Sequence, residues 1–219
     1  MVLAYLMAQL IPWRDNSSGR LVLSAANLDE TLRGYFTKYD CSSADLNPIG
    51  CISKRDIRAF VSQQCTEVAN SPQLVQCLQD VLNAVPSAEL EPCNSENQQT
   101  DEVDMGITYA ELSLFGRLRK QQFCGPYTML QRLLNGAWEE ALNDGELESS
   151  QLASFPQARS QEFARFLCDR VQFFFRMFAL NRHKSTVLPP ACHVESYSAD
   201  DNRYSFSLSH PLNIPVQLR

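Results

Sequence analysis

The stretch LVLSAANLDETLRGYF, residues 21–36, decides the fold class of this chain. Its first three residues, Leu21, Val22 and Leu23, form a short apolar run that small residues follow directly. Such a run is typical of a buried parallel strand that turns tightly into a helix. The helix is expected over residues 28–39, with leucine and aromatic side chains on one side. We therefore predict an α/β fold.

Helical patterns occupy most of the remaining sequence. Ser53 and Thr108 each stand three residues before an acidic residue, which is the capping-box signature of a helix start. The helix that begins at Ser53 is expected to bury Ile57, Phe60 and Val61. Other helices are expected over residues 2–10, 73–82 and 108–120, through residues 129–138 after a break at Gly125 and Pro126, and from about residue 160. The last of these is the longest, and its phenylalanine stripe is expected in the core.

Two features predict that the sequence is part of a larger unit. The first helix, residues 2–10, has no capping residue and no turn signal ahead of it. Residues 21–23 are the one clear strand, with a second candidate near Val187, and a lone strand leaves its backbone amides without partners. Either the strand pairs with another chain, or the rest of its sheet is missing from the sequence. The uncapped helix favours the second explanation, so we expect an incomplete doubly wound parallel sheet in a mainly helical chain.

Composition excludes several classes of protein. The 219 residues are 44% hydrophobic and 20% charged, so we expect a buried core rather than a disordered or collagenous chain. The net charge of -6 argues against nucleic-acid binding. No apolar run approaches the roughly 18 residues of a membrane span. The 8 cysteines have no zinc-ligand spacing, and free thiols in a cytoplasmic setting are favoured over a disulfide scaffold.

The densest functional signal is TKYDCSSADLNPI, residues 37–49. Lys38, Asp45 and the nearby Lys54 lie among turn-forming residues, where ammonium groups and free amides suit phosphate and a carboxylate suits ribose hydroxyls. A solvated loop with surface lysines explains the same composition equally well. Glu30, in the first turn after the strand, either interacts with the helix dipole or binds magnesium at the carboxyl end of the strand.

Two further groups of charged residues each have two interpretations. Asp101, Glu102 and Asp104 form an acidic cluster that suits a cation, although a solvated charged loop is the favoured interpretation. His183 and Lys184 directly follow the longest helix, where they either complement the helix dipole or neutralise an anionic ligand. The sequence contains no recognisable serine nucleophile elbow.

At these residues the sequence resembles the C-terminal synthetase domain of the glutamine-dependent NAD synthetases. The shared strings occur in the same order and cover nearly the whole chain: LDETLRGYFTKYDCSSADLNPIG, ISKRDIRAF, PSAELEP, QTDEVDMGITYAELSLFGRLRK, CGPY, NRHK and SADDNR. The resemblance implies a fold like that of the pyrophosphate-loop ATPases and adenine nucleotide alpha hydrolases. It also implies a ligase of NAD biosynthesis, in which ATP adenylates the nicotinate carboxylate of deamido-NAD, ammonia displaces AMP, and magnesium offsets the phosphate charge.

The resemblance also implies a role for individual positions. Glu30 matches a magnesium-associated glutamate, and Lys54 and Ser87 match ATP contacts. The positions that match deamido-NAD contacts are Tyr35, Lys38, Asp45, His183 and Lys184. Ser24 and Ala25 stand where the family usually has glycine followed by serine or threonine, so a hydroxyl contact to ATP is lost or displaced there. No residue of the chain is assigned a catalytic role.

The same resemblance implies a domain organisation. Residues 1–185 correspond to the C-terminal part of the synthetase domain without its SGGxDS pyrophosphate loop, and residues 186–219 to an irregular tail. The N-terminal glutaminase domain of the nitrilase type, which releases ammonia from glutamine, is absent from the sequence. We expect the whole enzyme to be a homo-oligomer and this chain alone to be inactive. The alternative is a non-catalytic module that pairs with intact synthetase subunits through its aromatic helix faces.

Overall fold

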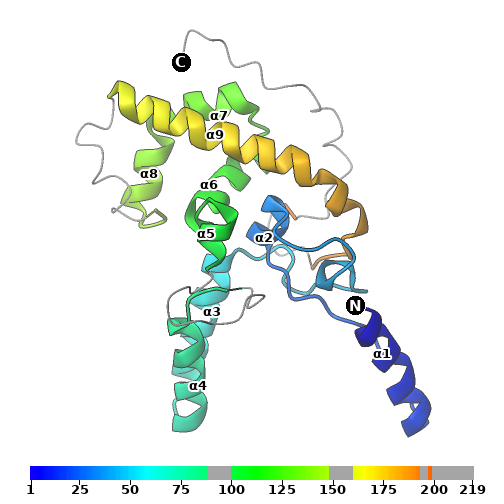
Figure 1. Cartoon of the computed structure of the whole chain (residues 1–219). Helices are drawn as coiled ribbons and strands as arrows, with labels where there is room; N and C mark the ends of the chain where they lie inside the picture. The colour runs from blue at the N-terminus through cyan, green and yellow to red at the C-terminus, as the bar shows by residue number, and fades with distance from the viewer. Residues whose placement is uncertain (88–99, 148–159, 193–196, 199–219) are drawn as a thin grey trace, which may run out of the picture.

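The computed structural model describes residues 1–87, 100–147, 160–192 and 197–198 (Figure 1). The α-helices in these ranges are α1 (Val2–Asp15), α2 (Leu28–Arg33), α3 (Lys54–Glu67), α4 (Pro72–Asn83), α5 (Asp101–Met105), α6 (Tyr109–Lys120), α7 (Pro126–Arg132), α8 (Trp138–Asn143) and α9 (Gln161–Asn181). A π-helical turn, Leu133–Ala137, joins α7 to α8, and two 3-10 turns span Cys41–Ser43 and Arg182–Val187. The predominance of helix predicted from the sequence is confirmed for these ranges.

The core lies between α9 and the helices α6, α7 and α8, which α9 crosses in Figure 1. The buried residues of α9 recur at spacings of three and four: Phe163, Leu167, Cys168, Val171, Phe174, Phe175 and Phe178. They share one apolar cluster with Phe115, Met129 and Trp138. Phe174 meets Phe115 edge-on, with the ring centroids 5.5 Å apart. The predicted phenylalanine stripe is confirmed as core, so these aromatic faces are not open to a second subunit.

Local capping signals predicted the starts of two helices correctly. Thr108 Oγ1 accepts a hydrogen bond from Glu111 N at 3.2 Å, and Glu111 Oε2 accepts one from Thr108 N at 3.0 Å, which completes the capping box of α6. Ser53 Oγ accepts from Asp56 N at 3.1 Å at the start of α3. The side chain of Asp56 bonds to the Ser53 hydroxyl rather than to the predicted backbone amide. As predicted, α1 starts without a side-chain cap.

Two helices differ from their predictions because of their tertiary surroundings. The structure ends α2 at Arg33, not at residue 39, because Gly34 adopts a left-handed conformation with φ 74°. A Cβ at Gly34 would lie 2.3 Å from Asn181 Cβ, so the close approach of α9 also requires glycine there. The predicted inner face of α3 is wrong: this helix has no buried residue, and Phe60 is 61% exposed. In Figure 1, α3 and α4 pack on each other and extend away from the core.

The buried strand predicted at residues 21–23 is wrong in burial and extent. Leu21 and Leu23 are 71% and 58% exposed, and the pairing described for this segment is one isolated parallel bridge between Leu23 and Leu46. Ser24 N donates to Leu46 O at 2.8 Å. The amides of Val22 and Ser24 therefore find partners within the chain, an arrangement that neither explanation of a lone strand had anticipated.

A second isolated bridge involves the segment that follows the Arg182–Val187 turn. Asn47 pairs in parallel with Ala191, and Asn47 N donates to Pro190 O at 2.9 Å. The strand candidate near Val187 is wrong, because that residue ends a 3-10 turn and the pairing comes four residues later. Within the described ranges, two bridges thus stand where a parallel sheet was predicted. Residues 45–47 lie between the segment of Leu23 and the segment of Ala191.

The seven described cysteines are free thiols, as predicted: Cys41, Cys51, Cys65, Cys77, Cys124, Cys168 and Cys192. None of the helices in the described ranges combines the length and the apolar character that a membrane crossing requires. Cys93 and most of the tail predicted at residues 186–219 lie outside the described residues.

Candidate nucleotide site

Three helices meet at the hydroxyl of Tyr109, the first residue of α6. Tyr109 Oη lies 3.1 Å from Glu30 Oε1 of α2 and 2.9 Å from Asp101 Oδ2 of α5. Lys54 Nζ, at the start of α3, lies 3.9 Å from the same Glu30 oxygen and 5.3 Å from the centroid of the Tyr109 ring. Burial, together with the two carboxylates, raises the pKa of Tyr109. We call Glu30, Lys54, Asp101 and Tyr109 the Tyr109 junction.

A capping box holds Glu30 in the first turn of α2. Asn27 Oδ1 accepts from Glu30 N at 2.9 Å, and Glu30 Oε2 accepts from Asn27 N at 3.2 Å. Asn27 Nδ2 also donates to Glu30 Oε1 at 2.6 Å. The Asn-x-x-Glu spacing is the sequence signal from which this cap could be predicted. The cap holds the Glu30 carboxylate beside Lys54 and Tyr109.

Asp29 is a buried carboxylate that the sequence analysis missed. Its side chain is 1% exposed, and its Oδ2 accepts from Lys54 N at 2.8 Å, which ties the start of α3 to α2. Asp29 Oδ1 has no hydrogen-bond partner among the described residues. Burial raises the pKa of Asp29 to about 7, although the Lys54 amide favours the charged form. No local pattern signals this residue, because the elements that bury it are distant in the sequence.

Asp101 brings the segment of Ser87 to the same junction. Asp101 N donates to Pro86 O at 2.9 Å, so Ser87 follows directly on a residue that is bonded to α5. The Asp101 side chain is 5% exposed, and its Oδ1 has no hydrogen-bond partner in the described part of the chain. The interpretation of residues 101–104 as a solvated loop is therefore wrong, since they form a helix whose first residue is buried.

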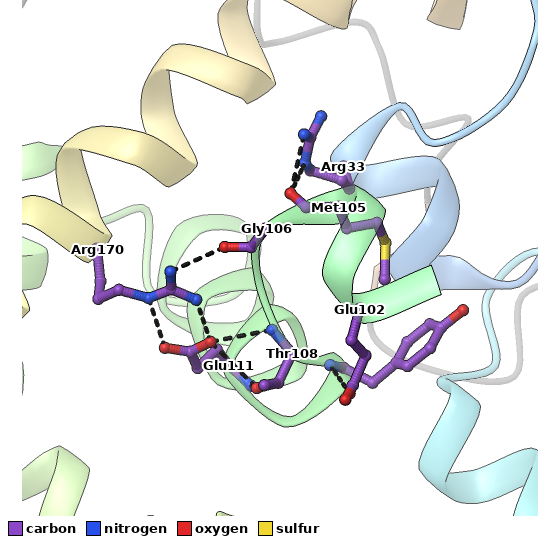
Figure 2. Close-up of polar contacts among 8 residues, drawn as sticks. Arg33, Glu102, Met105, Gly106, Thr108, Glu111 and Arg170 are labelled. Carbon is purple, nitrogen blue, oxygen red and sulfur yellow. Dashed lines mark hydrogen bonds and ion pairs between the residues drawn. The ribbon is translucent and has the colours of Figure 1, made fainter. Parts of the chain in front are cut away.

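A second polar network fixes the turn that carries Tyr109 (Figure 2). Arg170 of α9 donates from Nε to Glu111 Oε1 at 2.7 Å and from Nη1 to Gly106 O at 2.8 Å, and its Nη2 pairs with Glu111 Oε2. Tyr109 N donates to Glu102 Oε1 at 2.8 Å. Glu111 is 1% exposed, so Arg170 compensates its charge with little screening by water. Both ends of the α5–α6 turn are thus anchored.

Two of the expected deamido-NAD positions bond to other parts of the protein: Tyr35, just beyond α2, and Lys184, in the 3-10 turn that follows α9. Tyr35 Oη donates to Asp104 Oδ2 at 3.0 Å. Lys184 Nζ donates to Gly34 O and to Phe36 O, both at 2.8 Å, and so holds the backbone on either side of Tyr35. Burial raises the pKa of Tyr35 and lowers that of Lys184.

The other three deamido-NAD positions do not join this group. Asp45 is exposed, and its carboxylate accepts from Val22 N at 2.8 Å and from Tyr5 Oη at 3.2 Å, which connects α1 to the bridged segment. Lys38 is half-buried. His183 is exposed, whereas its neighbour Lys184 points to the α2 loop, so the predicted basic pair is divided.

The donors of the Tyr109 junction fit magnesium as a partial site. Carboxylate oxygens such as those of Glu30 are the ligands that Mg²⁺ prefers, and Asp101 Oδ1 is a buried acceptor without a partner in the described part. Among the described residues, no three His, Cys, Asp or Glu side chains are grouped to hold a metal ion. Protein-bound Mg²⁺ commonly has one or two carboxylate ligands and completes its shell with substrate phosphates and water. The junction suits that arrangement.

Comparisons with known proteins agree with the resemblance seen in the sequence. The family model described as NAD synthase matches residues 6–123. The glutamine-dependent NAD(+) synthetase of Drosophila melanogaster is 51% identical over 207 residues, which cover 93% of this chain and 23% of that protein. Those of Saccharomyces cerevisiae and Bos taurus are 47% and 50% identical, with 25% and 26% of their length covered. This chain thus spans about a quarter of the length of these relatives.

The structural comparison supports the fold. A crystal structure of a glutamine-dependent NAD(+) synthetase from Cytophaga hutchinsonii matches with a TM-score of 0.50 and 18% sequence identity, covering 92% of this chain and 26% of that one. The sequence identity to the curated relatives and the family match over more than half of the residues together show that the chain belongs to the NAD synthase family.

Proposed function

We propose that this chain forms the part of an NAD synthase that binds ATP and deamido-NAD while deamido-NAD is amidated to NAD. The observation that carries the proposal is the Tyr109 junction. There Lys54 Nζ stands 3.9 Å from Glu30 Oε1, and Ser87 follows a residue bonded to Asp101. The magnesium position and the two ATP positions expected from the resemblance therefore belong to one small region.

The chemistry of the junction suits the first half of the proposed reaction. A carboxylate is a poor electrophile, so the nicotinate oxygen first attacks the α-phosphorus of ATP and pyrophosphate leaves. Ammonia then attacks the carbonyl carbon of the mixed anhydride, and AMP departs with the electrons of the carbon–oxygen bond. Lys54 would neutralise phosphate charge as a point cation, and Glu30 would hold magnesium, which when bound offsets the remaining phosphate charge.

The expected dinucleotide residues divide into two roles in this proposal. Lys38 and His183 have half-buried and exposed polar groups that can contact deamido-NAD directly. The exposed carboxylate of Asp45 can do so while it also accepts from Val22 N and Tyr5 Oη. Tyr35 and Lys184 are bonded to other parts of the protein, so we assign them to shaping the backbone of residues 34–36.

The wider organisation of the enzyme belongs to the same proposal. Residues 1–185 are the C-terminal part of the synthetase domain, and Ala191 and Tyr197 of the following tail pack onto it. The bridged segments are the edge of a doubly wound parallel sheet. The whole enzyme is a cytoplasmic homo-oligomer that takes its ammonia from glutamine.

Equilibrium dialysis of the 219-residue chain against radiolabelled ATP and deamido-NAD tests the binding roles. Lys54→Met is expected to weaken ATP binding in Mg²⁺ and to leave deamido-NAD binding unchanged. Asp45→Asn is expected to do the reverse. Lys120→Met, at the opposite end of α6 from Tyr109, is the charge-matched control. The proposal fails if neither ligand binds, or if Lys54→Met and Asp45→Asn both bind as the wild type does.

One observation favours the alternative of a non-catalytic interaction module. Exposed apolar side chains are spread along the whole of α1, with exposed fractions of 43% to 84%: Val2, Leu3, Leu6, Met7, Leu10 and Trp13. Exposed apolar patches are typical of interaction sites. The partner surface is then α1, since the aromatic faces are buried in the core. Co-sedimentation of this chain with an intact synthetase tests the alternative, with Leu3→Glu and Trp13→Glu expected to abolish it.

A further inference from the structure

One tyrosine hydroxyl connects carboxylates from two different helices. Tyr109 Oη is within hydrogen-bond distance of Glu30 Oε1 and of Asp101 Oδ2, at 3.1 Å and 2.9 Å. A tyrosine hydroxyl has a single proton to donate, so the two carboxylates share one donor. The arrangement links the state of Glu30 to that of Asp101.

The tyrosine itself is held from several sides. Tyr109 is 9% exposed, its amide is bonded to Glu102, and the capping box of its helix is completed by Glu111. The ammonium group of Lys54 lies over its ring. Asn27 holds the Glu30 carboxylate from within α2. Tyr109 holds the same carboxylate from α6, so its hydroxyl sets the position of Glu30 relative to the neighbouring helices.

The separation of Glu30 from Lys54 has a chemical meaning. At 3.9 Å between Nζ and Oε1 the two charges lie near the limit of an ion pair. A closer contact would let them neutralise each other, and neither would then be available to a magnesium–phosphate group. Tyr109 Oη and Asn27 Nδ2 both bond to the same Glu30 oxygen and oppose that approach, Tyr109 from outside α2 and Asn27 from within it.

We propose that Tyr109 is a positioning residue: its hydroxyl keeps the Glu30 carboxylate apart from Lys54 and, through Asp101, in register with the Ser87 segment. The inference rests on the proposed ATP site and adds a residue that neither the sequence nor the resemblance assigned. In this arrangement Tyr109 touches neither ATP nor the cation and acts through Glu30.

Radiolabelled ATP, dialysed against the chain in Mg²⁺ and again in EDTA, separates this role from a general structural one. For Tyr109→Phe we expect the gain in ATP affinity caused by Mg²⁺ to fall roughly 10- to 100-fold, as when groups that orient a metal ligand are removed. The affinity in EDTA is expected to stay at the wild-type value. Tyr127→Phe, on an exposed tyrosine of α7, is the matched control.

A double variant tests whether Tyr109 acts through Glu30. If it does, the variant that combines Tyr109→Phe with Glu30→Gln binds ATP in Mg²⁺ no more weakly than Glu30→Gln alone. Additive losses overturn the inference, and so does an equal loss of affinity in EDTA. A wild-type response of Tyr109→Phe, with Lys54→Met impaired, overturns the inference and leaves the ATP site standing. If Mg²⁺ does not strengthen ATP binding to the wild-type chain, both the ATP site and the inference are refuted.

Discussion

Replacing Arg170 by methionine tests whether the turn that carries Tyr109 depends on a buried ion pair. Glu111 is 1% exposed, and its carboxylate receives Arg170 Nε at 2.7 Å and Thr108 N at 3.0 Å. Arg170→Met leaves the Glu111 charge in place but removes its compensating cation. The α5–α6 turn also loses the bond from Arg170 to Gly106 O.

The size of the effect follows from the burial of the two partners. Removing one member of a buried ion pair typically costs about 3–5 kcal/mol. Arg170 is 22% exposed, and Thr108 remains bonded to Glu111, so we expect a loss near the lower limit, about 3 kcal/mol. For a chain of this size, each kcal/mol corresponds to roughly 2–4 °C, which places the fall in Tm at about 6–12 °C.

Thermal unfolding followed by far-UV circular dichroism measures this effect. Arg165→Met, which removes an exposed arginine from the same helix, is the control. The double variant Arg170→Met with Glu111→Gln is expected to be more stable than Arg170→Met alone, because the uncompensated charge is gone. The reasoning is refuted if Arg170→Met unfolds at the same temperature as Arg165→Met, or if Glu111→Gln gives no recovery.

Three further outcomes are expected. The pKa of Asp29 is raised to about 7, so its protonated form stabilises the fold. This contribution is complete below the unfolded-state pKa of about 4 and is lost as the pH rises through about 7. Urea unfolding at a series of pH values should show a flatter stability profile for Asp29→Asn, and an unchanged profile contradicts the prediction. Gly50→Ala is expected to lower the free energy of unfolding by about 1–3 kcal/mol, since its Cβ would lie 2.7 Å from Asn47 Nδ2 and 2.9 Å from Ala191 Cβ; the same urea assay checks it, with Gly19→Ala, which meets no atom within 4 Å, as the control. The 219-residue chain should form no NAD from deamido-NAD, ATP, Mg²⁺ and ammonia, because its sequence has no SGGxDS phosphate loop; measurable turnover in an assay specific for NAD would overturn this expectation.

Local sequence signals predicted the positions of helices better than they predicted which residues are buried. The cap at Thr108 and the apolar period of α9 were correct because a capping residue and a periodic face act within one or two turns of helix. The inner face of α3 and the burial of residues 21–23 were wrong because burial needs a partner element. Their periodicity and apolar character would suit a core, but no other described element covers Phe60 or Leu23 sufficiently to bury it.

The candidate site shows the same division. The sequence pointed to Glu30 and Lys54 separately, and the resemblance to a known family added Ser87 and supplied the expected roles of all three. Neither the sequence pattern nor the resemblance pointed to Tyr109 or Asp29, which have no motif of their own. Their importance comes from where they lie relative to residues that are distant in the chain.

The sequence by itself determined the family, most of the helices and the apolar stripe of the core, because long shared strings, caps and periodicity are properties of neighbouring residues. The tertiary structure decided which carboxylates are buried, how α2 ends, and that Glu30, Lys54 and Asp101 meet at one hydroxyl. The physical reason is that hydrogen bonding and desolvation depend on distances in space. A contact such as that between Tyr109 and Glu30, 79 positions apart, exists only once α2, α5 and α6 have packed together.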